Sequence, residues 1–300
     1  MSAHTTSSPR VCVATRLHVG DMAKAPDVSK TAAFVEAAEK CATKVVVAVG
    51  VPGVPEEDAL SALAALAAQV RSAAPSAEVV PVHPWGNFVP ALNALVARAA
   101  DCDYLLFASV EAKPTPEAVA TLVGVLEAHE DALVCGAALA GHAFQTGDRN
   151  LTGTTTPWNT FALWRVRPLA VVGFPLVADG LFCPEGGGVE EVAAIECLRR
   201  VQDTAAPRAF LAKLPGGFPH WETSSFLDDP KRKAWHDRKM TSKASRAAAY
   251  VFLCFSFACC WPTSGARRHL ALLNGRILSP PAIAKVTHLD LTEGESVAAA

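Results

Sequence analysis

Short apolar runs alternate with longer segments of helical periodicity through the first half of the chain. The runs are mostly β-branched and have the length of strands, whereas the longer segments repeat apolar residues at spacings of three and four. The pattern predicts strands over residues 11–14, 45–49, 77–82, 104–108 and 132–137. It predicts helices over residues 31–42, 56–73, 88–99 and 116–129, the last with Thr115 as its N-cap and Pro116 in its first turn.

The strand at 45–49 is apolar at every position, which is typical of a central parallel strand covered on both faces. Repeated β-α-β units joined by short turns predict an α/β fold, a mostly parallel sheet flanked by helices in the manner of a Rossmann fold. Ligands of such sheets bind at the carboxyl ends of the strands. We therefore expect a site among the loops that follow Ala14, Val49, Val82 and Ala108.

The regular alternation stops at residue 142. A polar stretch over 142–160 precedes further predicted elements: a strand at 160–164, a glycine-containing loop at 175–188, a helix at 189–201 and a strand at 208–214. The composition then changes to tryptophan, histidine and mixed charge. We expect a core α/β domain over residues 10–215, a C-terminal helical extension over 216–290, and disordered ends at 1–9 and 291–300.

Composition narrows the class of protein. The chain is 51% hydrophobic and 19% charged with a net charge of −2, so it is unlike a disordered chain and has no basic field to bind nucleic acid. Its nine cysteines include no C-x-x-C pair and lie mostly in apolar runs. That usage predicts reduced, buried thiols in a cytoplasmic protein, and the polar N-terminus does not resemble a signal peptide.

The segment 247–261 is uncharged and rich in phenylalanine and cysteine. It is shorter than the roughly 20 residues that a membrane-spanning helix needs. We interpret it as a buried or surface-docked helix with no transmembrane span, and peripheral membrane contact is the alternative.

Polar residues follow the predicted strand 104–108 as Ser109-Val110-Glu111, ahead of Pro114-Thr115-Pro116. This layout resembles family 2 glycosyltransferases of the GT-A fold, in the nucleotide-diphospho-sugar transferase superfamily. In that family an Asp-x-Asp motif ends the corresponding strand, and its two carboxylates face a divalent ion on the donor diphosphate. The motif is degenerate here, because Ser109 and Glu111 occupy the two acidic positions.

The resemblance implies that Glu111 ligates Mg²⁺ or Mn²⁺ and that Ser109 binds a ribose hydroxyl or a phosphate oxygen of the donor. One carboxylate holds a metal less firmly than two, so metal dependence stays open. The alternative interpretation is a strand end with incidental polar residues.

A second match is Gly188-Val189-Glu190-Glu191 at the start of a predicted helix. In the same family an acidic pair at this place supplies the general base that deprotonates the acceptor hydroxyl. The resemblance makes Glu191 that base and Glu190 its neighbour. The alternative is ordinary acidic residues at a helix start, where the helix dipole stabilises anions.

Further candidates rest on position alone. Thr15 and Arg16 follow the first strand, where the family binds the donor nucleotide. His220 or His236 is a candidate metal ligand, and Lys239 or Lys243 a cation for the leaving diphosphate. A solvated amphipathic helix is the simpler reading of that region. Trp158 is either a platform for a sugar ring or a core residue.

These features favour an inverting, hexosyltransferase-type enzyme that transfers a sugar from a nucleoside diphosphate sugar to a hydroxyl acceptor. The alternative is a non-catalytic GT-A-like domain that binds a nucleotide or a partner. A sugar-phosphate nucleotidyltransferase is disfavoured, because residues 15–21 lack the glycine-rich basic loop that such enzymes use to hold a triphosphate. Donor and acceptor identity do not follow from the sequence.

Overall fold

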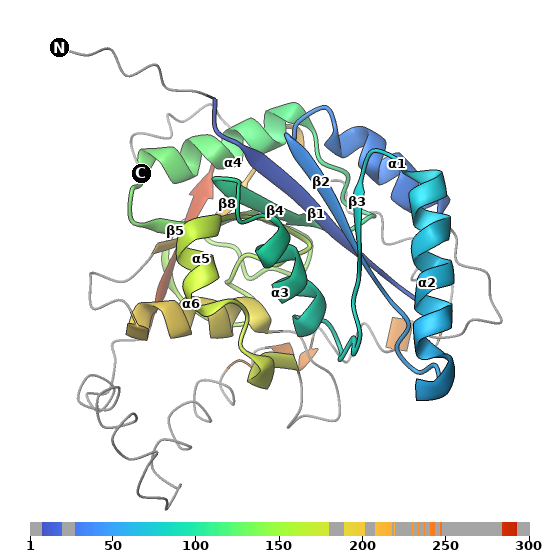
Figure 1. Cartoon of the computed structure of the whole chain (residues 1–300). Helices are drawn as coiled ribbons and strands as arrows, with labels where there is room; N and C mark the ends of the chain where they lie inside the picture. The colour runs from blue at the N-terminus through green and yellow to red at the C-terminus, as the bar shows by residue number, and fades with distance from the viewer. Residues whose placement is uncertain are drawn as a thin grey trace, which may run out of the picture.

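The computed structural model describes residues 8–19, 28–179, 189–201, 208–217, 219, 230, 233–234, 237, 241–243, 247 and 284–292 (Figure 1). Two predicted site residues, His220 and Lys239, lie outside the described residues, as do His236 and nearly all of the apolar segment 247–261. So do residues 1–7 and 293–300 at the two ends.

One nine-stranded sheet forms the centre of the molecule, with the order β3-β2-β1-β4-β7-β5-β8-β9-β6. Most neighbouring strands are parallel, while β7 is antiparallel to both β4 and β5, and β6 is antiparallel to β9. The strands are β1 (Val11–His18), β2 (Lys44–Gly50), β3 (Glu78–Pro81), β4 (Tyr104–Ala108), β5 (Ala132–Ala137), β6 (Gly147–Asn150), β7 (Phe161–Arg165), β8 (Arg208–Lys213) and β9 (Lys285–Asp290).

Helices cover both faces of the sheet (Figure 1). One hydrophobic cluster joins the sheet to three of them: α3 (Val89–Arg98), α5 (Val166–Val172) and α6 (Glu190–Val201). A second cluster joins the other face to α1 (Ser29–Ala38), α2 (Glu56–Ala73) and α4 (Pro116–Ala128). The predicted fold class, an α/β mostly parallel sheet flanked by helices, is therefore confirmed.

Several predicted elements have the observed bounds, notably β4, β5 and α2. Thr115 caps α4 as expected, because its side chain accepts a hydrogen bond from the Ala118 N–H at 3.2 Å. The Leu60 side chain of α2 is 67% exposed, and the buried positions of this helix begin at Ala59.

Two strands were not predicted, and one of them corrects the domain boundary. β6 lies in the polar stretch expected to be a loop, and β9 lies in the segment 216–290 expected to be a helical extension. β9 joins the core sheet, parallel to β8 and antiparallel to β6. Its buried positions Val286, His288 and Leu289 do not alternate and include a histidine, so the sequence lacks a clear strand pattern. The core therefore does not end at Pro215.

The antiparallel direction of β7 brings the residues before it to the carboxyl end of β4. Because β7 is antiparallel to β4, the beginning of β7 lies beside the end of β4, and Phe161 pairs with Ala108. The polar residues Asn159 and Thr160, just before β7, therefore lie at the carboxyl edge of β4. This is the edge at which α/β sheets bind their ligands.

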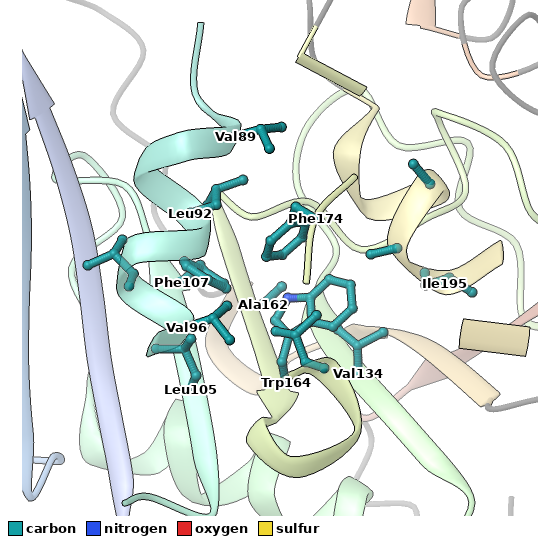
Figure 2. Packing of buried hydrophobic residues seen from close by; sticks show 14 of the residues in the cluster. Val89, Leu92, Val96, Leu105, Phe107, Val134, Ala162, Trp164, Phe174 and Ile195 are labelled. Atoms are coloured by element: carbon teal, nitrogen blue, oxygen red, sulfur yellow. The ribbon is translucent and has the colours of Figure 1, made fainter. Parts of the chain in front are cut away.

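Trp164 is the centre of the core on the α3, α5 and α6 face (Figure 2). Its ring is fully buried and meets Phe174 edge-on at 5.4 Å, and Phe174 meets Phe107 in the same way at 5.5 Å. The indole N–H donates to the Asn159 side-chain oxygen at 2.9 Å. The core is thereby bonded directly to the segment that begins β7.

The described cysteines agree with the predicted reduced thiols. Cys12, Cys41, Cys102, Cys135 and Cys197 are free and are buried or partly buried. Burial raises the pKa of the Cys12 thiol to about 12, so it stays protonated at neutral pH. Among the described helices, none combines the length and the apolar character needed to cross a membrane.

Candidate functional site

Glu191 is a buried acid with a strongly raised pKa. It lies in the first turn of α6 with a side chain that is only 5% exposed, and its Oε1 accepts a hydrogen bond from the Asn159 backbone N–H at 2.6 Å. Burial and the neighbouring Glu190 raise the pKa of Glu191 to about 7, against the opposing effects of Lys243 and the Asn159 N–H. Its carboxyl group is therefore about half ionised at neutral pH.

A short backbone link connects Glu191 to the degenerate motif. Asn159 holds Glu191, while the carbonyl of the next residue, Thr160, accepts a hydrogen bond from the Ser109 N–H at 2.9 Å. The two predicted motifs, 80 positions apart in the sequence, thus meet at one edge of the sheet. This proximity supports grouping Ser109, Glu111 and Glu191 in one site.

In the turn after β4, the side chains of Ser109 and Glu111 bind each other. The Ser109 hydroxyl donates to the Glu111 carboxylate, and the Glu111 N–H donates to the same hydroxyl at 3.2 Å. Among the residues that the structure describes, no three His, Cys, Asp or Glu side chains form a group that would hold a metal ion. Divalent cations prefer several oxygen ligands, so the described part of this site does not fit one.

Arg16 reaches the same edge from β1. Ala14 pairs with Phe107 of β4, so Arg16 lies beyond the end of the shorter neighbouring strand. Its half-buried guanidinium lies near three carboxylates. Burial lowers the pKa of Arg16, while Glu190, Glu191 and Asp179 act in the opposite direction.

Within the described part of the chain, no acid lies at ion-pairing distance from the Arg16 guanidinium, and no hydrogen bond engages it. Its N–H groups therefore have no acceptor among the described residues. An arginine fork suits phosphate oxygens in particular, because it can donate two parallel hydrogen bonds.

Thr15 does not lie beside the Arg16 guanidinium. Successive strand residues point to opposite faces, and Val13 belongs to the cluster under α1, α2 and α4 whereas Ala14 belongs to the cluster under α3, α5 and α6. Thr15 therefore points toward the α1 side, 2% exposed and with its hydroxyl without a partner. The structure separates the two residues predicted to bind the donor together.

Asp179 was not identified from the sequence, yet it organises this edge. Its carboxylate accepts hydrogen bonds from the backbone N–H groups of Asn87, Phe88 and Val89, at 2.7–2.8 Å. These groups belong to the start of α3, so Asp179 caps that helix from a distant part of the chain. No local motif marks it, because the acid and the helix it caps are separated by about 90 positions.

Replacing Asp179 by alanine is expected to lower the free energy of unfolding by about 2 kcal/mol or more, because buried N–H groups lose their acceptor. Urea unfolding of the variant measures the loss. Asp58→Ala, at an exposed acid in the first turn of α2, is the matched control and should change stability by less than about 0.5 kcal/mol. Equal effects of the two substitutions would contradict the capping role.

Trp158 and Lys243 adjoin the base candidate. Trp158 is 2% exposed, its ring stacks on His142 at 3.7 Å, and the Lys243 ammonium lies 3.2 Å from its ring centroid. A sugar ring therefore has no access to the Trp158 face, and the core interpretation of this residue is confirmed. Lys243, a candidate cation from the sequence, is itself buried and lowers the pKa of Glu191.

Comparison with known proteins gives structural neighbours only. No protein-family model matches the chain, and no curated protein matches it. The chain is similar to solved structures at low sequence identity. The mannosyltransferase PcManGT from Pyrobaculum calidifontis, in complex with GDP-Man and Mn²⁺, is 13% identical with a TM-score of 0.44 over 92% of this chain and 82% of its own.

Two other neighbours match a smaller part of the chain. Residues 1–349 of S. aureus TarS are 13% identical with a TM-score of 0.38, over 63% of this chain and 55% of that one. The M. tuberculosis glucosyl-3-phosphoglycerate synthase is 15% identical with a TM-score of 0.38, over 64% and 66%.

Proposed function

We propose that this protein transfers a sugar from a nucleoside diphosphate sugar to a hydroxyl group. The observation that carries the proposal is Glu191, a buried carboxyl group with a pKa raised to about 7, at the ligand-binding edge of the sheet. A general base works best when its pKa is close to the operating pH. Glu191 can therefore take the proton of an acceptor hydroxyl at neutral pH.

The proposed reaction is a single displacement. The acceptor oxygen forms a bond to the anomeric carbon as its proton moves to Glu191, and the bond from that carbon to the diphosphate breaks with the electron pair leaving on the diphosphate. Attack opposite the leaving group inverts the anomeric configuration. The Asn159 N–H fixes Glu191 Oε1, so Oε2 is the oxygen that takes the proton.

Arg16 is the proposed donor-binding cation. Its guanidinium lies at the end of β1 and has no hydrogen-bond partner among the described residues. It offers two parallel hydrogen bonds to the diphosphate and stabilises the charge that develops on the leaving group. Ser109 and Glu111 line the adjacent turn and are the proposed contacts to donor hydroxyls. No step is assigned to a metal, because the described residues do not fit one.

A thermal-shift screen of UDP- and GDP-sugars, each with Mn²⁺ and with EDTA, tests the proposal, followed by assays of donor hydrolysis and transfer. We expect at least one donor to raise the melting temperature, as any ligand of the folded state does. Arg16→Gln should weaken that donor at least tenfold, since a charge-assisted contact is lost, whereas Arg167→Gln, at an exposed arginine of α5, should not.

The outcomes separate the two functions left open by the sequence. Absence of any shift with every nucleotide would reject both sugar transfer and nucleotide binding. Nucleotide binding with donor hydrolysis at background, unchanged in Glu191→Gln, would support a non-catalytic nucleotide-binding domain instead.

A further inference from the structure

Two buried polar atoms beside Glu191 have no hydrogen-bond partner. They are Oε2 of Glu190 and Nδ2 of Asn159, and both residues are at least nine-tenths buried. Glu190 precedes Glu191 in the first turn of α6, and Asn159 is the residue whose N–H holds Glu191. The unsatisfied acceptor and the unsatisfied donor thus both belong to residues that directly neighbour the proposed base.

Unsatisfied buried polar groups are rare in folded proteins, because each loses its hydration without compensation. Two other polar groups of Asn159 are engaged: its side-chain oxygen accepts from Trp164, and its backbone N–H donates to Glu191. Turning the amide over would break the Trp164 bond. Its Nδ2 is therefore held as a donor that has no partner among the described residues.

The two glutamates cannot bind the same group in the same way. Consecutive residues of an α-helix point about 100° apart, because there are 3.6 residues per turn. If Glu191 takes the proton of the reacting hydroxyl, the Glu190 carboxylate must bind a different group of the acceptor. The charged groups around the pair are Arg16, Asp179 and Lys243, and among the described residues Arg16 forms no ion pair with Glu190.

We propose that Glu190 and Asn159 bind a second hydroxyl of the acceptor, adjacent to the one that reacts, so that the acceptor is a vicinal diol such as a sugar ring. A hydroxyl donates one hydrogen bond and accepts others, which matches an unpartnered carboxylate oxygen together with an unpartnered amide N–H. A simple alcohol would leave both atoms unsatisfied. The assignment of the reacting hydroxyl rests on the proposed function, whereas binding of the diol does not.

Three six-membered ring alcohols test the inference: cis-1,2-cyclohexanediol, cis-1,3-cyclohexanediol and cyclohexanol. Binding to the full-length protein is measured by saturation-transfer NMR without donor. The kcat/KM for each alcohol is then measured with the donor found by thermal shift. We expect the 1,2-diol to exceed the other two at least tenfold in both measurements, because sites built to hydrogen-bond a hydroxyl reject analogues that lack it.

Glu190→Gln is expected to reduce the ratio of the 1,2-diol to the 1,3-diol at least tenfold. Glu117→Gln is the matched control, an exposed acid in the first turn of α4, and should leave the ratio unchanged. The ratio compares two ligands on one protein, so partial unfolding of a variant does not mimic the effect. The wild-type ratio decides the matter even if the variant does not fold.

Equal binding and equal kcat/KM for the 1,2- and 1,3-diols in the wild-type protein would overturn the inference. A preference for the 1,2-diol in NMR without any donor turnover would retain the diol site and reject the transfer reaction. Donor hydrolysis without any diol preference would retain the reaction and reject the diol site. The two proposals thus fail separately.

Discussion

Replacing Glu191 by glutamine is expected to lower kcat for sugar transfer by roughly two to four orders of magnitude, the usual contribution of a general base. The protein should stay folded, because the amide oxygen of glutamine can still accept the 2.6 Å hydrogen bond from the Asn159 N–H. Turnover is measured with the donor found by thermal shift. Glu117→Gln should retain wild-type turnover, and a Glu191→Gln variant of undiminished activity would exclude Glu191 as the base.

The same residue makes the rate depend on pH. Glu191 acts as a base only when ionised, and its pKa is raised to about 7 by burial and by Glu190. The kcat/KM should therefore rise about tenfold per pH unit below 7 and level off above it. A profile that stays flat from pH 5 to 8 would contradict this assignment.

The free energy of unfolding should fall as the pH rises, whereas kcat/KM should increase. The folded pKa of about 7 exceeds the unfolded value of 4.5, so the folded protein keeps a proton that the unfolded chain releases in this range. The stabilisation is complete below pH 4.5 and is lost as the pH rises to 7, a change on the order of 3 kcal/mol. Urea unfolding of Glu191→Gln should lack this pH dependence. The wild-type protein provides the comparison at each pH.

Replacing Trp164 by alanine is expected to lower the free energy of unfolding by about 3 to 5 kcal/mol, as for other fully buried aromatic residues. The ring fills the centre of the core between Phe174, Val134 and Ala162 (Figure 2). Removing the indole would leave a cavity beside Phe174, whose ring packs edge-on against both Trp164 and Phe107. Equilibrium unfolding in urea measures the loss.

The milder change Trp164→Phe tests whether Trp164 positions the base. It keeps most of the ring and removes only the N–H that donates to Asn159 at 2.9 Å. Asn159 then loses its anchor, and its N–H bond to Glu191, which lowers the pKa of Glu191, weakens. We expect kcat to fall about tenfold or more and the pH midpoint of kcat/KM to move above 7.

Trp85→Phe is the matched control for that substitution. Trp85 is buried as Trp164 is, at 4% exposure, but its indole N–H has no hydrogen-bond partner. Loss of the Trp85 indole N–H should leave the pH midpoint of kcat/KM unchanged. A pH midpoint that does not move in Trp164→Phe would show that Trp164 supports only the core.

The sequence predicted the parts of the fold that are encoded locally. Strand β4 and the Thr115-Pro116 start of α4 have strong local signals, and both are observed as predicted. β9 was missed because its partners, β8 and β6, are distant in sequence and its buried face carries His288. Pairing between distant segments decides whether such a half-polar segment becomes a strand.

The candidate site shows the same division between local and distant signals. Glu190 and Glu191 were singled out because their segment resembles an acidic segment of family 2 glycosyltransferases, and the structure buries both side chains. Asn159 and Asp179 were not found, because their roles depend on backbone N–H groups that the fold brings to them from elsewhere. Thr15 and Arg16 were grouped as neighbours in sequence, whereas the alternation of the strand sends them to opposite faces.

The position of β9 has a consequence for synthesis of the protein. β9 is the last described strand in the chain, yet it lies inside the sheet between β8 and β6. Until residues 285–290 leave the ribosome, β8 keeps an open edge and β6 has no partner strand. A chain cut short before residue 285 would expose that edge to other molecules. Premature termination should therefore yield aggregates rather than a smaller folded protein.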